Sequence, residues 1–287
     1  MPSVVDALTM LGGIAPARDL LAGGLTEQQL RTASLRAEVL RFRKGWYALR
    51  GTSEEVIRAS RVGGALCCAS AAAFHRLWVP DTSRLHVSVH RTASRLRDPD
   101  RHRTRLDPAD AKVIVHWTGD RRAAHLWSQP VDTSLLEIVG CQGAAAGFVV
   151  FESALRKGRF DRIGEELFRA SLPADLRPFF APANRLSDSG TESILKLALI
   201  EGGIPFRQQV LVPGVGPVDF LIGEALVVEV DSKEFHSDAL RERRKDAALS
   251  IRDFRTHHYF YSQVMFELAE VMDAIRAALA RGDHHIR

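Results

Sequence analysis

The feature that most restricts the fold of this chain is a set of carboxylates embedded in apolar, β-prone segments near its C-terminus. Asp219 lies between two apolar residues, and Glu229 and Asp231 alternate with valines in the run 226–231. Side chains alternate between the two faces of a strand, so Glu229 and Asp231 are expected on one face and the valines on the other. The segment therefore predicts a small sheet that carries several acidic groups on one side.

The neighbouring segments predict the order helix, three-stranded meander, helix. Thr191 can cap a helix with a broad apolar face, and Glu192 falls in its first turn, where a carboxylate favours the helix dipole. Strands are expected over 206–212, 218–222 and 226–231, with glycine-containing turns between them. The prediction for this region is a mixed α/β domain.

Three carboxylates that converge on one face repel each other unless a cation offsets their charge. Hard divalent cations prefer oxygen ligands of this kind. The sequence therefore predicts that Asp219, Glu229 and Asp231 hold Mg²⁺ or Mn²⁺.

The helix with Glu192, the strand "VDF", the run "VVEVDSKEFH" and the basic helix that follows together resemble the PD-(D/E)XK nuclease superfamily. The closer likeness is to an endonuclease-like branch related to the very-short-patch repair (Vsr) endonuclease. In that branch a strand ends in Glu-x-Asp-Gly, and a histidine and an arginine/aspartate-rich helix follow; Glu229, Asp231 and His236 match these positions. The resemblance implies a restriction-endonuclease-like αβββαβ core and a metal-dependent DNA endonuclease.

Two departures from the family pattern bear on activity. Ser232 stands where the branch has glycine, and Asp231 stands where the Glu-x-Lys signature has lysine. The hypothesis is that Lys233 contacts the scissile phosphate instead and that His236 transfers a proton, with Glu192 in the outer shell of the metal. If neither Lys233 nor His236 reaches the phosphate, the fold is expected to persist without activity.

A basic helix is expected to hold the DNA backbone through phosphate contacts, which position a substrate without reading its sequence. The helix is expected over 241–255, and its candidate contacts are Arg241, Arg243, Arg244 and Lys245.

The N-terminal segment predicts three helices followed by a two-stranded hairpin with a basic turn. The sequence "GIAPARDLLAGGLTEQQLRTASLRAEVLRFRKGWYALRG" is similar to the N-terminal winged helix-turn-helix domain of abortive-infection type IV antitoxins, a family of DNA-binding autoregulators. The resemblance implies that this domain contacts DNA. The candidate contacts are Gln28, Gln29 and Arg31 in the third helix and Arg43 and Lys44 in the hairpin.

The sequence predicts three domains: a winged helix-turn-helix over 1–52, an α+β middle domain over 53–184 and the nuclease-like domain over 185–287. The middle domain contains strand-like segments 85–89 and 113–117, and an arginine-rich loop between them is expected to be mobile or bound to an anion. The proline-rich stretch 171–188 has the composition of a linker, which places the second boundary there.

Composition indicates the class of protein and the redox state of its cysteines. With 46% hydrophobic and 26% charged residues among 287, the chain is typical of a folded globular protein. It has three cysteines, Cys67, Cys68 and Cys141, which form neither CxxC pairs nor a secreted-type framework, and they are expected to be reduced and structural. No membrane-spanning run or signal sequence is found, and a cytoplasmic location is expected.

Two other functions fit the sequence. The protein could be an antitoxin-like transcriptional regulator whose C-terminal nuclease fold is inactive. It could also neutralise a cognate toxin, or bind another protein, through residues 54–170. A nucleotide-binding glycine loop is absent from the sequence, which argues against ATP-driven remodelling.

Overall fold

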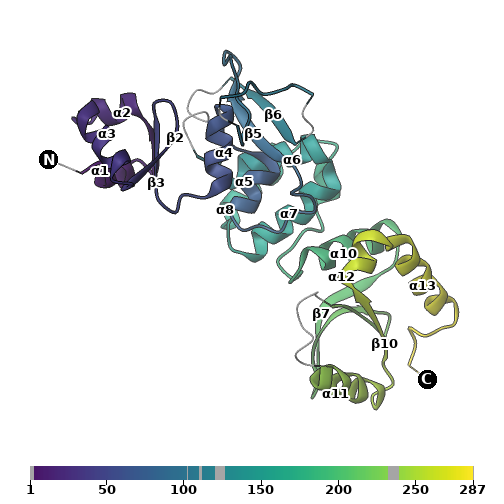
Figure 1. The fold of residues 1–287 in the computed structure, drawn as a ribbon. Helices are drawn as coiled ribbons and strands as arrows, with labels where there is room; N and C mark the ends of the chain where they lie inside the picture. The colour runs from purple at the N-terminus through teal and green to yellow at the C-terminus, as the bar shows by residue number, and fades with distance from the viewer. Residues whose placement is uncertain (1–2, 102, 110–111, 120–126, 232–238, 287) are drawn as a thin grey trace. The chain divides into compact units, whose positions relative to one another are not determined.

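A computed structural model of the protein describes residues 3–101, 103–109, 112–119, 127–231 and 239–286 (Figure 1). The chain is mixed α/β and divides into two compact units. Unit 1 comprises Met1–Arg76 and Asp81–Cys141, and unit 2 comprises Leu77–Pro80 and Gln142–Arg287. The predicted boundary near residue 184 falls inside unit 2, and the division into three domains stays a prediction.

The first part of unit 1 is a small sheet with three helices. Its elements are α1 (Val4–Met10), β1 (Ile14–Pro16), α2 (Ala17–Ala22), α3 (Glu27–Leu35), β2 (Val39–Arg43) and β3 (Trp46–Leu49). The antiparallel sheet has the order β1-β3-β2. Arg43 pairs with Trp46, so the β2–β3 turn consists of Lys44 and Gly45, and Gly45 has the positive φ of 73° that such a turn favours.

The second part of unit 1 surrounds another three-stranded sheet. Its elements are α4 (Glu54–Val62), β4 (Ala65–Leu66), α5 (Cys68–Phe74), β5 (Leu85–His90), β6 (Val113–Thr118) and α6 (Val131–Gln142). The order is β4-β5-β6, with β5 antiparallel to β4 and parallel to β6. Gly64 lets α4 turn into this sheet, because a Cβ there would lie 2.0 Å from the carbonyl oxygen of Ser88.

Unit 2 begins with helices around a buried ion pair. These are α7 (Ala144–Arg156), α8 (Arg162–Ser171), α9 (Arg177–Phe180) and α10 (Gly190–Glu201). Glu152 of α7 lies 2.6 Å from Lys196 of α10, and both side chains are buried. Glu152 also accepts hydrogen bonds from the hydroxyls of Ser187 and Ser193. The stretch with linker-like composition thus includes residues that are held by hydrogen bonds inside unit 2.

The rest of unit 2 is a four-stranded sheet between helices. Its elements are β7 (Phe206–Val212), β8 (Gly216–Ile222), β9 (Leu226–Asp231), α11 (Ala239–Ser250), β10 (Arg255–Phe260), α12 (Tyr261–Phe266) and α13 (Leu268–Ala280). The order is β10-β9-β8-β7, antiparallel from β7 to β9, with β10 parallel to β9. The expected helix and three strands before residue 231 are all present.

The two faces of this sheet have separate cores. Phe220 and Val228 belong to a cluster with residues of α10 and α13, whereas Leu221 and Val227 pack with Leu249 of α11. Figure 1 shows α11 on one side of the sheet and α10, α12 and α13 on the other. The α11 face is the one that carries the odd-numbered residues of β9, which include Glu229 and Asp231.

Candidate functional sites

The predicted acidic residues belong to β8 and β9, and those of β9 lie on the sheet face that α11 covers. Glu229 is buried, with 7% of its surface exposed, and Asp219 and Asp231 are partly buried. Strand alternation places Glu229 and Asp231 on the same face as Val227, as the sequence predicts. Burial is the largest influence on the Asp219 and Glu229 carboxyls, and it raises the pKa of each.

Asp219 is held by two hydrogen bonds. Its Oδ2 accepts from the backbone N–H of Val230 at 3.0 Å, and its Oδ1 accepts from Nε2 of Gln209 at 3.1 Å. Gln209 has a positive φ of 50°, which is uncommon for a residue other than glycine. Such backbone conformations persist when surrounding contacts impose them, and they cluster at functional sites.

Glu192 reaches the same group from α10. Its Oε2 accepts from the backbone N–H of Asp188 at 2.8 Å and from Nε2 of Gln209 at 3.4 Å, so Gln209 bridges Glu192 and Asp219. Burial, with the charge of Asp219, raises the pKa of Glu192 to about 7. This carboxyl is therefore near its titration midpoint at neutral pH.

Lys245 enters the acidic group from α11. Its Nζ donates to Oε1 of Glu229 at 2.5 Å. Leu249, one helical turn later, is fully buried against the sheet, which directs this face of α11 toward β9. The sequence predicts Lys245 as a DNA-backbone contact, whereas in the structure it pairs with Glu229, a predicted metal ligand.

His258 of β10 lies beside Glu229 in the parallel β9–β10 ladder. Its Nδ1 is 3.4 Å from Asp231, and its Nε2 is 2.9 Å from Asp246 of α11. Burial lowers the pKa of His258, but the hydrogen bond and charge of Asp246 and the charges of Asp231 and Glu229 outweigh it, so the pKa is raised. The imidazole thus joins three acidic side chains from β9 and α11.

The structure gathers some predicted residues and leaves others apart. Within the described part of the chain, the oxygens of Asp219, Glu229 and Asp231 do not form a group that lies entirely within 4.8 Å. Asp219 and Glu229 both interact with the Lys245 cation. Asp231 instead lies 3.4 Å from Nδ1 of His258. Lys233 and His236 lie outside the described residues, so their proposed roles stay predictions.

Sequence reasoning missed Gln209 and His258 as members of this site. Both project from strands, and nothing in their spacing marks them, because their partners come from other elements. For Asp246, the sequence predicted only that it belongs to the arginine/aspartate-rich helix. A basic residue four positions before a buried leucine was the one local signal for the position of Lys245.

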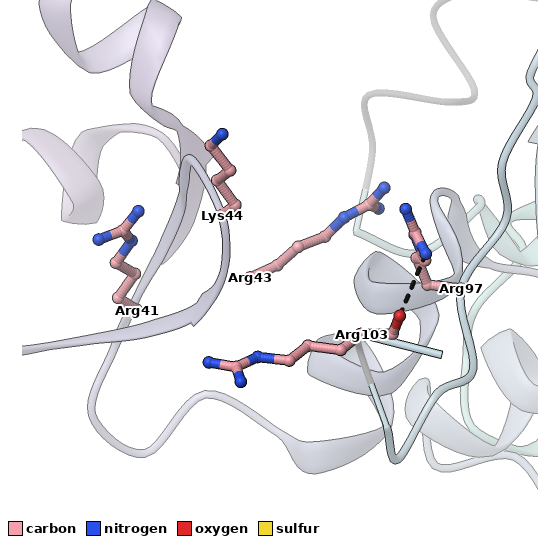
Figure 2. A pocket seen from close by; sticks show the side chains of 5 residues that line it. All are labelled: Arg41, Arg43, Lys44, Arg97 and Arg103. Atoms are coloured by element: carbon pink, nitrogen blue, oxygen red, sulfur yellow. Dashed lines mark hydrogen bonds between the residues drawn. The ribbon is translucent and has the colours of Figure 1, made fainter. Parts of the chain in front are cut away.

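Unit 1 contains a separate, strongly basic pocket of about 740 Å³. It is lined by Arg41, Arg43 and Lys44 of the β2–β3 hairpin and by Arg97 and Arg103 of the arginine-rich loop (Figure 2). Among the described residues, none of the five forms an ion pair with a carboxylate. The pocket therefore offers uncompensated positive charge to an anion.

Two of these arginines are anchored by backbone carbonyls. Arg43 donates to the carbonyl oxygens of Ser60 at 3.2 Å and Arg61 at 3.1 Å, and Arg97 donates to that of Arg103 at 3.2 Å, the dashed line in Figure 2. Burial, followed by the charge of Arg97, lowers the pKa of Arg43. The anchored guanidinium groups are pre-positioned, at an electrostatic cost that a bound anion would offset.

The remaining predicted DNA contacts occupy different settings. Gln28 and Arg31 of α3 are exposed, but Gln29 closes a capping box in which its Oε1 accepts from the backbone N–H of Thr26 at 2.8 Å. The basic helix α11 ends at Ser250 rather than at residue 255, where β10 begins. Within α11, Arg243 and Arg244 are exposed. Arg241 belongs to the same helix, and its side chain lies outside the described set.

No protein-family model matches the chain, and no curated protein matches it either. The described residues include no helix that is both long and apolar enough to cross a membrane.

Proposed function

We propose that the protein is a metal-dependent DNA endonuclease, in which unit 2 hydrolyses phosphodiester bonds and unit 1 contributes DNA binding. The observation that carries this proposal is a linked acidic group: Gln209 bridges Glu192 and Asp219, and the Lys245 ammonium pairs with Glu229. Phosphodiester hydrolysis needs charge stabilisation at the phosphate, and this set offers both acidic ligands and a cation.

The acidic residues suit a hard divalent cation such as Mg²⁺ or Mn²⁺. Asp219 and Glu229 supply the oxygen donors, and burial raises the pKa of both, so a cation nearby would offset the cost of their ionisation. A bound cation of this kind polarises phosphoryl oxygens and makes a water more acidic. Asp231 remains a candidate third ligand, and Glu192 stays in the outer shell.

Lys245 is proposed to contact the scissile phosphate, which makes it an alternative to Lys233 for the lysine that the Glu-x-Lys signature lacks here. Its ammonium lies 2.5 Å from Glu229, so a phosphate bound to a cation on Glu229 would lie close to this lysine. His258 is a positioning residue, because both of its ring nitrogens are directed at carboxylates that flank the site.

DNA binding is assigned to the first part of unit 1, which we propose to be a winged helix-turn-helix, and to the exposed arginines of α11. The support is the order of α1, α2 and α3 against the β1-β3-β2 sheet, with a hairpin that carries Arg41, Arg43 and Lys44. Likewise, the order α10-β7-β8-β9-α11-β10 supports a restriction-endonuclease-like core in unit 2.

The test is incubation of the full chain with supercoiled plasmid and Mg²⁺ or Mn²⁺. Glu229→Gln and Asp219→Asn should each slow nicking by at least about 100-fold, since loss of a metal contact is worth roughly 3 kcal/mol or more of barrier. Both variants should keep DNA binding in EDTA. Glu224→Gln is the matched control, because Glu224 is exposed in the β8–β9 turn; cleavage by Glu229→Gln at the wild-type rate would refute the assignment.

Lys245→Ala and Arg244→Ala form a second matched pair. Each removes one positive charge from α11, but only Lys245 contacts Glu229, whereas Arg244 is exposed. If Lys245 acts at the phosphate, its variant loses turnover while Arg244→Ala only weakens binding. If Lys245→Ala and Arg244→Ala lowered binding and cleavage equally, Lys245 would only contact the DNA backbone.

A DNA-binding regulator with an inactive nuclease-like unit is the second candidate. The observation that favours it is the close Lys245–Glu229 pair, which satisfies Glu229 without a metal. Calorimetry with Mn²⁺ separates the two functions: binding heat that Glu229→Gln abolishes supports the nuclease, and its absence in the wild type supports the regulator.

A further inference from the structure

Four side chains of unit 1 that could bind a metal lie close together in space, and none of them belongs to the acidic site of unit 2. They are Cys68, His86, His116 and Cys141, and their ligand atoms all lie within 4.8 Å of one another. Nδ1 of His86 is 3.0 Å from Nε2 of His116 and 4.0 Å from Sγ of Cys141. Tetrahedral zinc with Zn–N and Zn–S bonds of about 2.0 and 2.3 Å spaces its ligand atoms about 3.3–3.8 Å apart, within the same range.

Four different elements bring these side chains together. In the parallel β5–β6 ladder Ser88 pairs with His116, so His86, two residues earlier on the same strand face, is the diagonal neighbour of His116. Cys68 is the first residue of α5, and Cys141 lies in the last turn of α6. Because α5 and α6 each supply one sulfur to the sheet's two imidazoles, the cluster connects both helices to the sheet.

The backbone at Cys68 has an unusual conformation that the cluster would explain. Its φ is 48°, in the left-handed region that residues other than glycine seldom adopt, and its N–H donates to Oε2 of Glu137 at 2.8 Å. The backbone N–H of His86 donates to Oγ of Ser70 at 2.9 Å. The backbone of these two ligand residues is thus held by hydrogen bonds to neighbouring side chains.

We propose that Cys68, His86, His116 and Cys141 bind one structural Zn²⁺ ion. Two thiolates and two neutral imidazoles form a donor set that zinc prefers and that Mg²⁺ and Ca²⁺ do not. Four protein ligands leave no open position, which is the arrangement of a structural site. Binding replaces the two thiol protons, which are released, so the two thiolates balance the charge of the ion.

Cys67 provides an internal control. It belongs to an alternative group with His116 and Glu137, and its thiol is buried next to the proposed ligand Cys68. The two groups predict opposite outcomes: a site built on Cys68 and Cys141 tolerates Cys67→Ser, and a site built on Cys67 does not.

The experiment is a Co²⁺ titration of the full, reduced, metal-free chain, followed by displacement with Zn²⁺. The expected result is one Co²⁺ per chain with the visible bands of tetrahedral cobalt and a near-ultraviolet thiolate charge-transfer band, all lost on adding one equivalent of Zn²⁺. Cys141→Ser should weaken Zn²⁺ binding by more than about 100-fold, because loss of an outer-shell partner alone costs about 10–100-fold. Cys67→Ser and Glu229→Gln should leave the bands unchanged.

Cys141 is exposed, so its serine variant is expected to fold and can be compared directly with the wild type. Circular dichroism in the absence of metal checks this for each variant. The proposal is overturned if the reduced wild type shows no thiolate band with Co²⁺, or if Cys67→Ser abolishes the band while Cys141→Ser keeps it. Because Glu229→Gln leaves this readout intact, failure here is separate from failure of the nuclease assignment.

Discussion

Glu192→Gln should stabilise unit 2 at alkaline pH in the absence of divalent cations. Glu192 is 4% exposed, and burial together with the charge of Asp219 raises its pKa from 4.5 to about 7. The folded chain therefore keeps the proton to higher pH than the unfolded chain. Stability is largest below about pH 4.5 and falls as pH rises toward 7, which is the sign expected for a carboxyl whose folded pKa is raised.

The size of the effect follows from the same values. A pKa raised from 4.5 to about 7 corresponds to about 3 kcal/mol once the group is fully ionised, at about 1.4 kcal/mol per pH unit. About 2.5 kcal/mol of this loss falls between pH 5 and 8. Glutamine keeps an acceptor for the N–H of Asp188 and cannot ionise, so the variant should lack this part of the pH dependence.

Native-state hydrogen exchange of the β8 and β9 amides in the full chain, at pH 5 and pH 8 in EDTA, measures the stability of unit 2. Glu201→Gln, exposed at the other end of α10, is the control and should behave as the wild type. At pH 8, adding Mg²⁺ or Mn²⁺ should raise the stability of unit 2 in the wild type. The same addition should have less effect on the stability of Glu192→Gln. Parallel pH profiles for wild type and Glu192→Gln would refute the reasoning.

Three further outcomes are expected. Lys196→Met should lower the free energy of unfolding of unit 2 by about 3–5 kcal/mol in urea titrations, because it leaves Glu152 charged and buried without its cation. Gly64→Ala should cost about 1–3 kcal/mol, measured as a lower thermal midpoint for unit 1, because its Cβ meets the Ser88 carbonyl oxygen at 2.0 Å. Lys44→Ala should reduce the slope of log K for DNA binding against log salt by about 1, with no change in thermal stability.

The acidic face of the C-terminal sheet could be predicted because it depends on a local rule. Alternation along β9 determines which side chains share a face once the strand has formed. The apolar residues around Glu229 predict that strand. The start of α10 was less well predicted. Ser189 caps this helix by accepting from the N–H of Glu192 at 3.1 Å, and Thr191, the expected cap, lies inside the helix because residue 190 is already helical.

The partners of those carboxylates could not be predicted from spacing. Lys245 reaches Glu229 because Leu249 packs against the sheet, and His258 reaches Asp231 because β10 runs parallel to β9 in a particular register. Both facts depend on how distant elements dock: the spacing of Lys245 and Leu249 places them on one face of α11, but it does not identify Glu229 as the partner. The sequence therefore predicted the acidic residues and the basic helix, but it did not predict that Lys245 pairs with Glu229 or that His258 lies beside Asp231.

The cysteine–histidine cluster shows the same limit. Its ligands come from two helices and two strands, so the short CxxC or HxxxH spacings that reveal many zinc sites are missing. The sequence supported only the expectation that the cysteines are reduced and structural. Their assembly becomes visible when the β5–β6 register brings His86 and His116 to the same face.

The two candidate features of unit 1 are connected through the same pair of strands. The loop with Arg97 and Arg103, which lines the basic pocket, leaves the end of β5 and returns to β6, the strands that carry His86 and His116. An ion bound by both histidines would fix the two strands relative to each other and thereby hold the ends of that loop. The loop would then present its guanidinium groups to an anion with less conformational entropy to lose. A structural metal in unit 1 would in this way strengthen phosphate binding without contacting the nucleic acid.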